Sequence, residues 1–175
     1  MLRLIIMRHA KSSWTDKELD DFDRPLSRKG KNAAPLVGRA LAERNCIPEL
    51  ILCSPARRTR DTLRLAVDAM KLKPPVRYED QLYSFGNGDS YVNAISRQKT
   101  VSPMMVIGHN PSVQNLALRL LGSRDNTAVQ KIKAKFPTAA VAVIALPIED
   151  WKQIQSKSEL QGEIELFLTP KMLKD

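Results

Sequence analysis

The chain has 175 residues, of which 43% are hydrophobic and 27% charged, with a formal net charge of +9. This size predicts a single domain spanning residues 1–175 that buries its own core. No apolar run approaches the roughly 20 residues of a membrane-spanning helix, and the apolar start is too short for a signal peptide. Cys46 and Cys53 have no metal-ligand spacing, so we expect them to be reduced and buried in a cytoplasmic protein without metal or cofactor.

The positive charge favours an anionic partner, such as phosphate groups, an acidic protein face or nucleic acid. Basic residues are spread along the whole chain, and only 5% of the residues are aromatic. Nucleic-acid-binding proteins usually concentrate their charge and often add aromatic side chains for stacking. We therefore do not expect nucleic acid or a membrane as the partner.

The first third of the chain predicts two buried strands separated by a helix. Residues 2–7 and residues 50–53 are short apolar runs of the buried-strand type. Between them, Ser27 is a suitable cap for a helix that runs to about residue 45. Pro35 and Gly38 weaken this helix, and they predict that it is kinked or starts late.

The middle of the chain continues the alternation. Ser54-Pro55 ends the second strand and can start a helix. That helix has one apolar face at helical spacing, formed by Leu63, Ala66, Val67 and Met70. Residues 76–78 predict a short strand, residues 85–88 a glycine-containing loop, and residues 90–97 another helix.

The last third predicts three further strands. Residues 104–107 form a strand that stops at Gly108, and the helix after it has an apolar face made of Val113, Leu116, Ala117, Leu120 and Leu121. Residues 123–137 are basic and predict irregular structure. Residues 139–146 predict a central strand, and residues 164–168 a half-buried one. Strands that alternate with helices predict an α/β fold with a mostly parallel sheet.

Polar residues of types that can bind ligands or take part in catalysis follow three of these strands. Arg8-His9 follows the first strand, the segment 54–58 ("SPARR") follows the second, and Gly108-His109 follows the strand at 104–107. Ligands of α/β sheets bind beyond the carboxyl ends of the strands. The chain has only two histidines, and both stand at such ends, so we expect one site at this edge of the sheet.

These residue types together indicate phosphoryl transfer. Arginine offers forked donors that match phosphate oxygens, and the helix starts near Pro55 and Ser112 add backbone N–H groups. A neutral imidazole can attack phosphorus while a second, protonated imidazole holds a phosphoryl oxygen. Each residue alone has an ordinary explanation as a structural histidine, a surface ion pair, a helix start or a turn. Only their joint pattern favours a catalytic site.

The motifs "RHA", "SPARRTRDT" and "GHNP" resemble those of the histidine phosphatase superfamily, the phosphoglycerate-mutase-like group. "LIIMRHAKSSW", "DFDRPLSRKG" and "FPTAAVAV" are similar to the short SixA-type phosphohistidine phosphatases. The resemblance runs nearly end to end. It implies a three-layer α/β/α sandwich with a mostly parallel central sheet, and a metal-independent phosphatase activity.

The resemblance also implies roles for individual residues. His9 is the nucleophile that becomes phosphorylated. Arg8 and Arg58 hold the phosphoryl group, and His109 is the second histidine of the pocket. Thr15 stands where several relatives carry an asparagine that contacts phosphate, and we expect it to contact phosphate here.

Two details of the motifs bear on these assignments. The family's clamp arginine is followed four residues later by a threonine, here Thr62, which selects Arg58 rather than its neighbour Arg57. The family's usual Arg-His-Gly reads with Ala10 in the third place, as in the SixA-type subgroup.

The proton donor of many relatives is missing from its usual place. Those relatives carry a glutamate in a Leu-x-Glu setting, and this chain has Leu82-Tyr83-Ser84 there. An alkoxide leaving group needs a general acid, whereas the imidazole of phosphohistidine can leave protonated. The substitution therefore favours phosphohistidine as the substrate. Alternatively, Glu79, Asp80 or Asp89 moves into the pocket as the acid, a movement that the loop 84–90 with its two glycines would permit.

The predicted function is removal of phosphate from phosphohistidine, on a phosphocarrier or phosphotransfer protein, through a phosphorylated His9. The short chain predicts an open, shallow pocket that suits a residue on a protein surface. One alternative is a general phosphomonoesterase that acts on a small phosphorylated metabolite. Another, of a different class, is a non-catalytic module that binds phosphate or nucleic acid.

Overall fold

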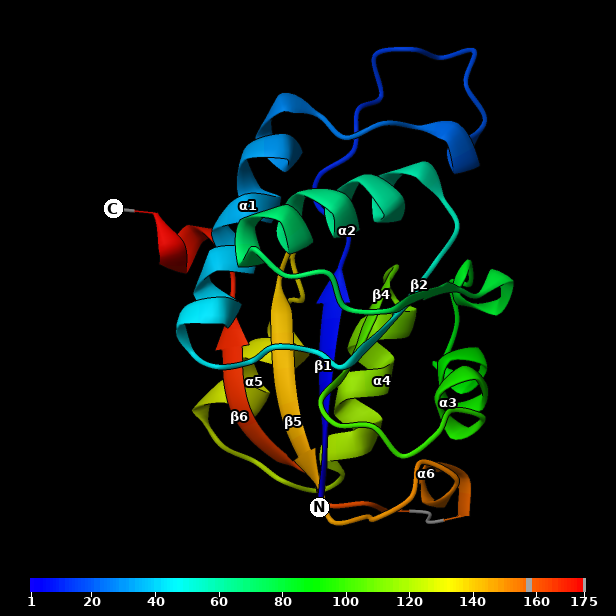
Figure 1. Cartoon of the computed structure of the whole chain (residues 1–175), viewed down its shortest axis with the longest axis vertical. Helices are drawn as coiled ribbons and strands as arrows, with labels where there is room; N and C mark the ends of the chain where they lie inside the picture. The colour runs from blue at the N-terminus through cyan, green and yellow to red at the C-terminus, as the bar shows by residue number, and fades with distance from the viewer. Residues whose placement is uncertain (157–158, 175) are drawn as a thin grey trace.

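A six-stranded sheet forms the centre of the computed structural model, which describes residues 1–156 and 159–174 (Figure 1). Its strand order is β3-β2-β4-β1-β5-β6. The strands are β1 (Leu2–Arg8), β2 (Leu50–Cys53), β3 (Val76–Tyr78), β4 (Met104–Gly108), β5 (Val141–Leu146) and β6 (Glu163–Leu168). Every strand expected from the sequence is present.

The directions of the strands explain which residues meet. β3, β2, β4 and β1 are parallel neighbours, whereas β5 runs antiparallel to both β1 and β6. β5 is reversed because two helices, not one, connect it to β4. The first helix leads the chain away from the carboxyl ends of the parallel strands, and the second returns it to them. The sheet is therefore mostly parallel, as predicted, with one inner strand running the other way.

Helices cover both faces of the sheet, so the predicted three-layer α/β/α sandwich is confirmed. α1 (Arg28–Glu43) and α2 (Arg57–Met70) lie on one face, and α3 (Asp89–Ser96), α4 (Ser112–Leu121) and α5 (Thr127–Ala134) lie on the other (Figure 1). Short elements complete the fold: α6 (Gln153–Ser156) and the 3₁₀ turns η1 (Asp21–Asp23), η2 (Asp80–Leu82) and η3 (Pro170–Leu173).

The alternation of side chains along the strands divides the core into two layers. In β1, Leu4 and Ile6 pack beneath α3, α4 and α5, while Ile5 and Met7 pack beneath α1 and α2. Because both faces are covered, the inner strands carry almost continuous apolar runs. This is why the inner strands were recognisable in the sequence.

α1 starts where predicted and tolerates the two residues that weakened its prediction. The Ser27 hydroxyl accepts a hydrogen bond from the Gly30 amide at 3.2 Å, which caps the helix. The helix continues through Pro35. Gly38 allows the close approach of α2, since an added Cβ would lie 2.2 Å from the carbonyl oxygen of Ala66.

The prediction of irregular structure at 123–137 was wrong, because this segment contains α5. The Asn126 side chain caps the helix by accepting from the Val129 amide at 3.0 Å. Val129 and Ile132 are the apolar residues that α5 buries, and lysines occupy much of its exposed side. Two apolar positions three residues apart were too weak a periodic signal to identify a helix.

The two cysteines, Cys46 and Cys53, are both free and buried, as predicted. No helix within residues 1–156 and 159–174 is long and apolar enough to cross a bilayer.

Candidate active site

The three strand ends meet beside one hollow at the carboxyl edge of the parallel strands. The His9 amide donates to the carbonyl oxygen of Gly108 at 3.0 Å, and the Ser54 amide donates to that of Ile107 at 3.1 Å. The ring centroids of His9 and His109 are 5.3 Å apart. The hollow has a volume of about 390 Å³, and Arg8, His9, Arg58 and His109 all line it. The structure thus brings four of the five predicted site residues together.

The surroundings of His9 fix its tautomer. The ring nitrogen Nδ1 lies 2.7 Å from the carbonyl oxygen of Ala10, which can only accept, so Nδ1 carries the proton and Nε2 keeps a free electron pair. The Ala10 amide in turn donates to the Thr62 hydroxyl at 2.9 Å, which fixes this turn. Burial lowers the pKa of His9 to about 3. The ring is therefore neutral at physiological pH and has the protonation state that a nucleophile requires.

The main chain of His9 is held from both sides. Its amide donates to Gly108 of β4, and its carbonyl oxygen accepts from the Ala139 amide, just before β5, at 3.0 Å. The reversed direction of β5 brings Ala139 to this edge of the sheet. The position of the imidazole is thus set by the central sheet.

His109 occupies the opposite wall. Its Nε2 lies 2.7 Å from the Ser54 hydroxyl, while its Nδ1 is buried without a hydrogen-bond partner among the described residues. Its amide donates to the Tyr91 hydroxyl, which lies so close to Gly108 that a Cβ there would be 1.9 Å away. Burial, followed by the unfavourable electrostatic interaction with the neighbouring His9 ring and with Arg58, lowers the pKa of His109 to about 2. The ring of His109 is therefore neutral in the free protein, and the prediction of a protonated second imidazole concerns the phosphate-bound state. A bound dianion would reverse the balance.

The helical phase of α2 separates the two neighbouring arginines. The Arg58 side chain is 2% exposed, and its Nη1 and Nη2 donate to the backbone oxygen (2.7 Å) and the carboxylate (3.0 Å) of Asp21. The Arg57 side chain is half exposed and pairs with Asp61 at 3.6 Å. The structure therefore places Arg58, not Arg57, at the hollow.

Unpaired polar atoms gather around the hollow. Among the described residues, the buried side-chain nitrogen and oxygen atoms without a hydrogen-bond partner are Arg8 Nε, Arg58 Nε, His109 Nδ1 and Asn110 Oδ1. All four residues line the same hollow. Buried donors without partners are costly and unusual in folded proteins. The two arginine Nε–H groups are donors of this kind, and they match the oxygens of a bound anion.

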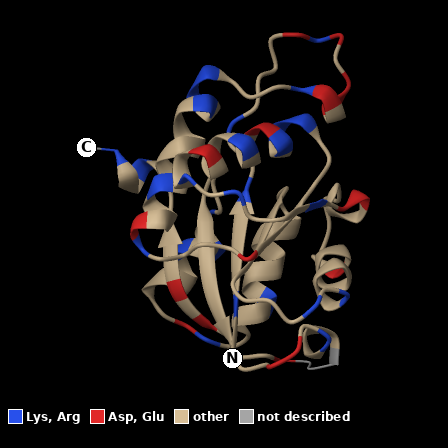
Figure 2. Cartoon of the chain, viewed as in Figure 1, with Lys and Arg blue, Asp and Glu red and all other residues tan. Residues whose placement is uncertain are grey.

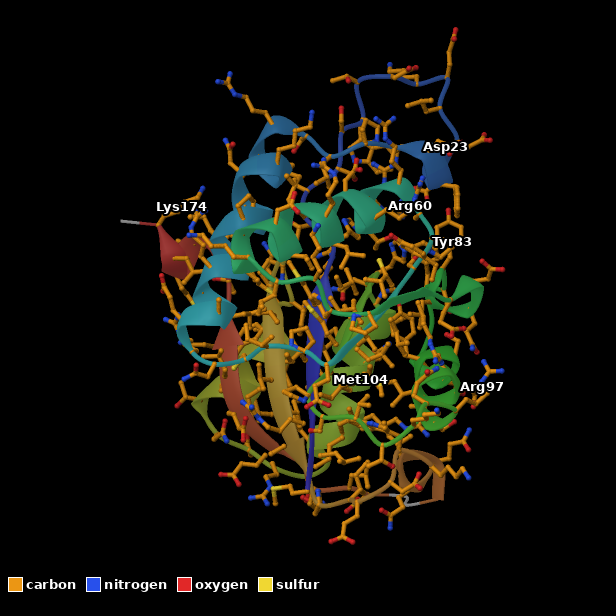
Figure 3. All side chains as sticks on the ribbon, in the orientation of Figure 1. Asp23, Arg60, Tyr83, Arg97, Met104 and Lys174 are labelled. Atoms are coloured by element: carbon orange, nitrogen blue, oxygen red, sulfur yellow. The ribbon has the colours of Figure 1, made fainter. Side chains whose placement is uncertain are left out.

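Arg24 and Asp21 are among the residues of the hollow that were not assigned a role from the sequence. Arg24 is buried, donates through Nη1 to the Ser12 hydroxyl at 2.8 Å, and stacks 3.4 Å from the ring centroid of Trp14. Asp21 contacts both Arg24 and Arg58, and its Oδ2 accepts from the Tyr83 hydroxyl at 2.6 Å. Burial opposes ionisation of Asp21, but the bonds from Tyr83 and Arg58 hold its pKa at about 2. Tyr83 lies near the start of α2 (Figure 3).

The remaining predicted residues lie elsewhere. Thr15 is exposed and its hydroxyl is bonded to that of Ser13 at 2.9 Å, outside the lining of the hollow. Glu79, Asp80 and Asp89 do not line the hollow either, and Asp89 pairs with Arg119 at 2.6 Å. Among the described residues that line it, Asp21 alone carries a carboxylate. No group of three or more His, Cys, Asp or Glu side chains in the described chain is placed to hold a metal ion.

A neutral imidazole with a free Nε2, surrounded by arginines at the edge of an α/β sheet, defines the class of phosphoryl-transferring enzymes. Residues 4–145 match the histidine phosphatase superfamily, branch 1. The chain belongs to this superfamily and is a metal-independent phosphatase.

Relatives of similar length support this assignment. A protein of Mycobacterium leprae without an assigned function is 34% identical over 172 residues, which cover 94% of this chain and 100% of the relative. A protein provisionally assigned as the phosphohistidine phosphatase SixA of Agrobacterium tumefaciens has a similar structure, with a TM-score of 0.78, 27% identity and coverage of 97% and 98%. A protein assigned in the same way from Nakamurella multipartitia has a TM-score of 0.79, 27% identity and coverage of 97% and 96%.

The lowered pKa values of the two histidines predict a loss of stability in weak acid. An unfolded histidine takes up a proton near pH 6.5, whereas folded His9 and His109 stay neutral down to about pH 3 and about pH 2. Below pH 6.5 the unfolded chain therefore binds more protons than the folded one. Each histidine should lower the free energy of unfolding by about 2 kcal/mol between about pH 7 and about pH 5.

Denaturant unfolding in phosphate-free buffer at several pH values checks this prediction. His9→Gln and His109→Gln should each remove about 2 kcal/mol of the pH-dependent change, because one titrating group is lost. An identical pH dependence in the wild type and both variants would contradict neutral histidines in the folded protein.

Proposed function

We propose that this phosphatase hydrolyses phosphohistidine in a protein substrate, with His9 as the residue that carries the phosphoryl group. One observation supports this choice of substrate most directly. The carboxylate that lines the hollow, Asp21, has a pKa of about 2 and is bonded to Arg24, Arg58 and Tyr83. It is ionised at neutral pH and has no proton to give to a leaving group.

A phosphohistidine substrate does not need such a proton donor. In the first step Nε2 of His9 forms a bond to phosphorus, and the bond between phosphorus and the substrate imidazole breaks. A substrate ring that is protonated at its other nitrogen leaves as neutral imidazole. Arg8, Arg58 and His109 surround the transferring group and stabilise its charge.

The second step can also release a neutral imidazole, because His9 Nδ1 donates a hydrogen bond to the Ala10 carbonyl oxygen. The phosphorylated ring keeps its proton on Nδ1, because the Ala10 carbonyl oxygen accepts a hydrogen bond from this N–H group. When water attacks phosphorus, the bond to Nε2 breaks, the two protons of the water stay on the released phosphate, and His9 leaves as a neutral imidazole. Both steps therefore release neutral imidazole, and neither requires a carboxylic acid in the hollow.

The similarity to proteins assigned as SixA phosphohistidine phosphatases supports the same proposal.

The proposal predicts strong selectivity for the leaving group. We expect kcat/KM for a phosphohistidine peptide to exceed that for the matching phosphoserine peptide by at least about 10³-fold, the contribution of a missing general acid. An aryl phosphate, with its activated leaving group, should fall between them. Release of inorganic phosphate from the three substrates measures this order.

Variants of the carboxylates separate this proposal from the alternative of a general phosphomonoesterase. Asp89→Asn and Glu79→Gln should leave turnover of all three substrates unchanged within about 3-fold, since neither residue lines the hollow. Efficient phosphoserine hydrolysis that is lost in one of these variants would refute the proposal and identify the acid.

A further inference from the structure

A second hollow, larger than the catalytic one, opens directly beside it. It has a volume of about 650 Å³. Five lysines line it, Lys11, Lys29, Lys135, Lys171 and Lys174, and we call it the lysine groove. Arg8, Lys11 and Thr138 line both hollows, so the groove is continuous with the site of the phosphoryl group. No acidic residue lines it among the described residues.

The five lysines come from separate parts of the chain that the fold brings together. Lys11 follows β1, Lys29 lies in the first turn of α1, and Lys135 directly follows α5. Lys171 and Lys174 belong to the C-terminal turn η3 and its end. Figure 2 shows basic residues at the start of α1 and at the C-terminal end of the chain, and Figure 3 labels Lys174 beside α1.

None of these lysines is neutralised within the described part of the protein. Each is exposed, and none takes part in a salt bridge there, whereas nearby Lys133 pairs with Asp125 at 3.8 Å. Like charges that are gathered in one hollow repel each other and are relieved by an anionic ligand. The lysine groove therefore has the charge of a binding site for anions.

The kind of cation indicates the kind of anion. Lysine is a flexible, strongly hydrated point charge, whereas arginine is the residue of rigid, two-pronged phosphate recognition. Arginines line the catalytic hollow and lysines line the groove. The ammonium groups lie at separate places around a hollow of about 650 Å³. They therefore match several separate carboxylates on a protein surface better than one compact phosphate.

We propose that the lysine groove binds an acidic segment of the protein substrate while its phosphohistidine occupies the catalytic hollow. This inference rests on the proposed function for the identity of the phosphorylated residue. Complementary charge mainly speeds association. The groove should therefore raise kcat/KM for acidic substrates and leave the chemical steps unchanged.

Two synthetic phosphohistidine peptides test the proposal. One carries four glutamates next to the phosphohistidine, and the other carries four glutamines in the same places. The enzyme variant is Lys29→Glu/Lys135→Glu/Lys171→Glu, which leaves out Arg8 and Lys11 because they also line the catalytic hollow. The matched control is Lys73→Glu/Lys99→Glu/Lys152→Glu, with the same change of net charge. These control lysines are exposed and lie in loops near the amino ends of the parallel strands, away from the carboxyl ends where the hollow opens.

The wild type should prefer the acidic peptide by about 10-fold or more in kcat/KM at low salt. The groove variant should lose this preference, and the control variant should keep most of it. All three proteins should turn over an aryl phosphate at similar rates. Equal losses in the groove and control variants would overturn the proposal, because only net charge would then matter.

Binding measurements keep this test separate from the proposed function. If the wild type turned over the aryl phosphate but neither phosphopeptide, the proposed substrate would be wrong. The Kd of the unphosphorylated acidic peptide would still report on the groove, and it should rise about 10-fold in the groove variant alone. An unchanged Kd, or tighter binding of a short DNA duplex than of the peptide, would refute an acidic protein segment as the occupant.

Discussion

His9→Ala is expected to abolish the phosphorylated enzyme and to lower kcat/KM by at least about 10⁴-fold, the scale seen when a nucleophile is removed. In the structure, His9 lines the hollow, and the hydrogen bond from its Nδ1 to the Ala10 carbonyl oxygen leaves Nε2 with a free electron pair. The other histidine, His109, has its Nε2 engaged with Ser54. The Nδ1 atom of His109 is buried, so we expect neither nitrogen of that ring to replace His9 as the nucleophile.

Rapid mixing with a ³²P-labelled phosphohistidine peptide measures this directly. The wild type should carry a label that is lost in acid and survives in base, as expected for a phosphorylated imidazole. His9→Ala should carry none, and its melting temperature shows whether the fold is intact. His109→Ala is the matched control, since it should slow turnover and still become labelled. A labelled His9→Ala protein would disprove the assignment of the nucleophile.

Arg58→Ala is expected to lower kcat/KM by about 10² to 10³-fold, because the proposed mechanism loses a buried donor that would stabilise the transferring group. Arg57→Ala should change it by less than about 3-fold, since the Arg57 side chain is exposed and pairs with Asp61 on the helix surface. The two variants remove the same charge from adjacent positions. Steady-state kinetics on the aryl phosphate compares them with one substrate.

Because Arg58 is hydrogen-bonded to Asp21, the loss in Arg58→Ala could come from either residue, and one further variant separates the two. Arg58→Ala also removes one partner of the Asp21 carboxylate, which keeps its contacts with Tyr83 and Arg24. Arg58→Ala/Asp21→Ala removes that carboxylate as well and should recover little of the lost activity. A larger loss in Arg57→Ala than in Arg58→Ala, or full recovery in the double variant, would contradict a direct role of Arg58 at the phosphoryl group.

The sequence predicted the strands, most of the helices and the meeting of His9 with His109. Those predictions rested on buried apolar runs and on the rule that ligands bind at strand ends. The same rule could not find Asp21 and Arg24, because they lie in a long polar loop between β1 and α1. Their role depends on how that loop folds back over the hollow, where Arg24 stacks on Trp14. No local periodicity reports such a contact.

The unrecognised helix α5 had a second consequence. With one helix between β4 and β5, the strand at 141–146 would have been expected to run parallel to its neighbours. The second helix reverses it, and this reversal brings Ala139 to His9. The direction of β5 thus depends on a helix whose sequence signal consists of two buried residues, Val129 and Ile132.

Hydrogen bonds to two neighbouring segments hold the main chain of His9, the proposed reacting residue, whereas part of the walls around it is formed by loops. Its hydrogen bonds to Gly108 and Ala139 belong to the most deeply packed part of the protein, where opening motions are the rarest. Asp21, Trp14 and Phe85 stand on surface loops, which accept insertions and substitutions far more readily. Substitutions in these loops would therefore change the walls of the hollow, while the central sheet keeps the His9 imidazole in its place.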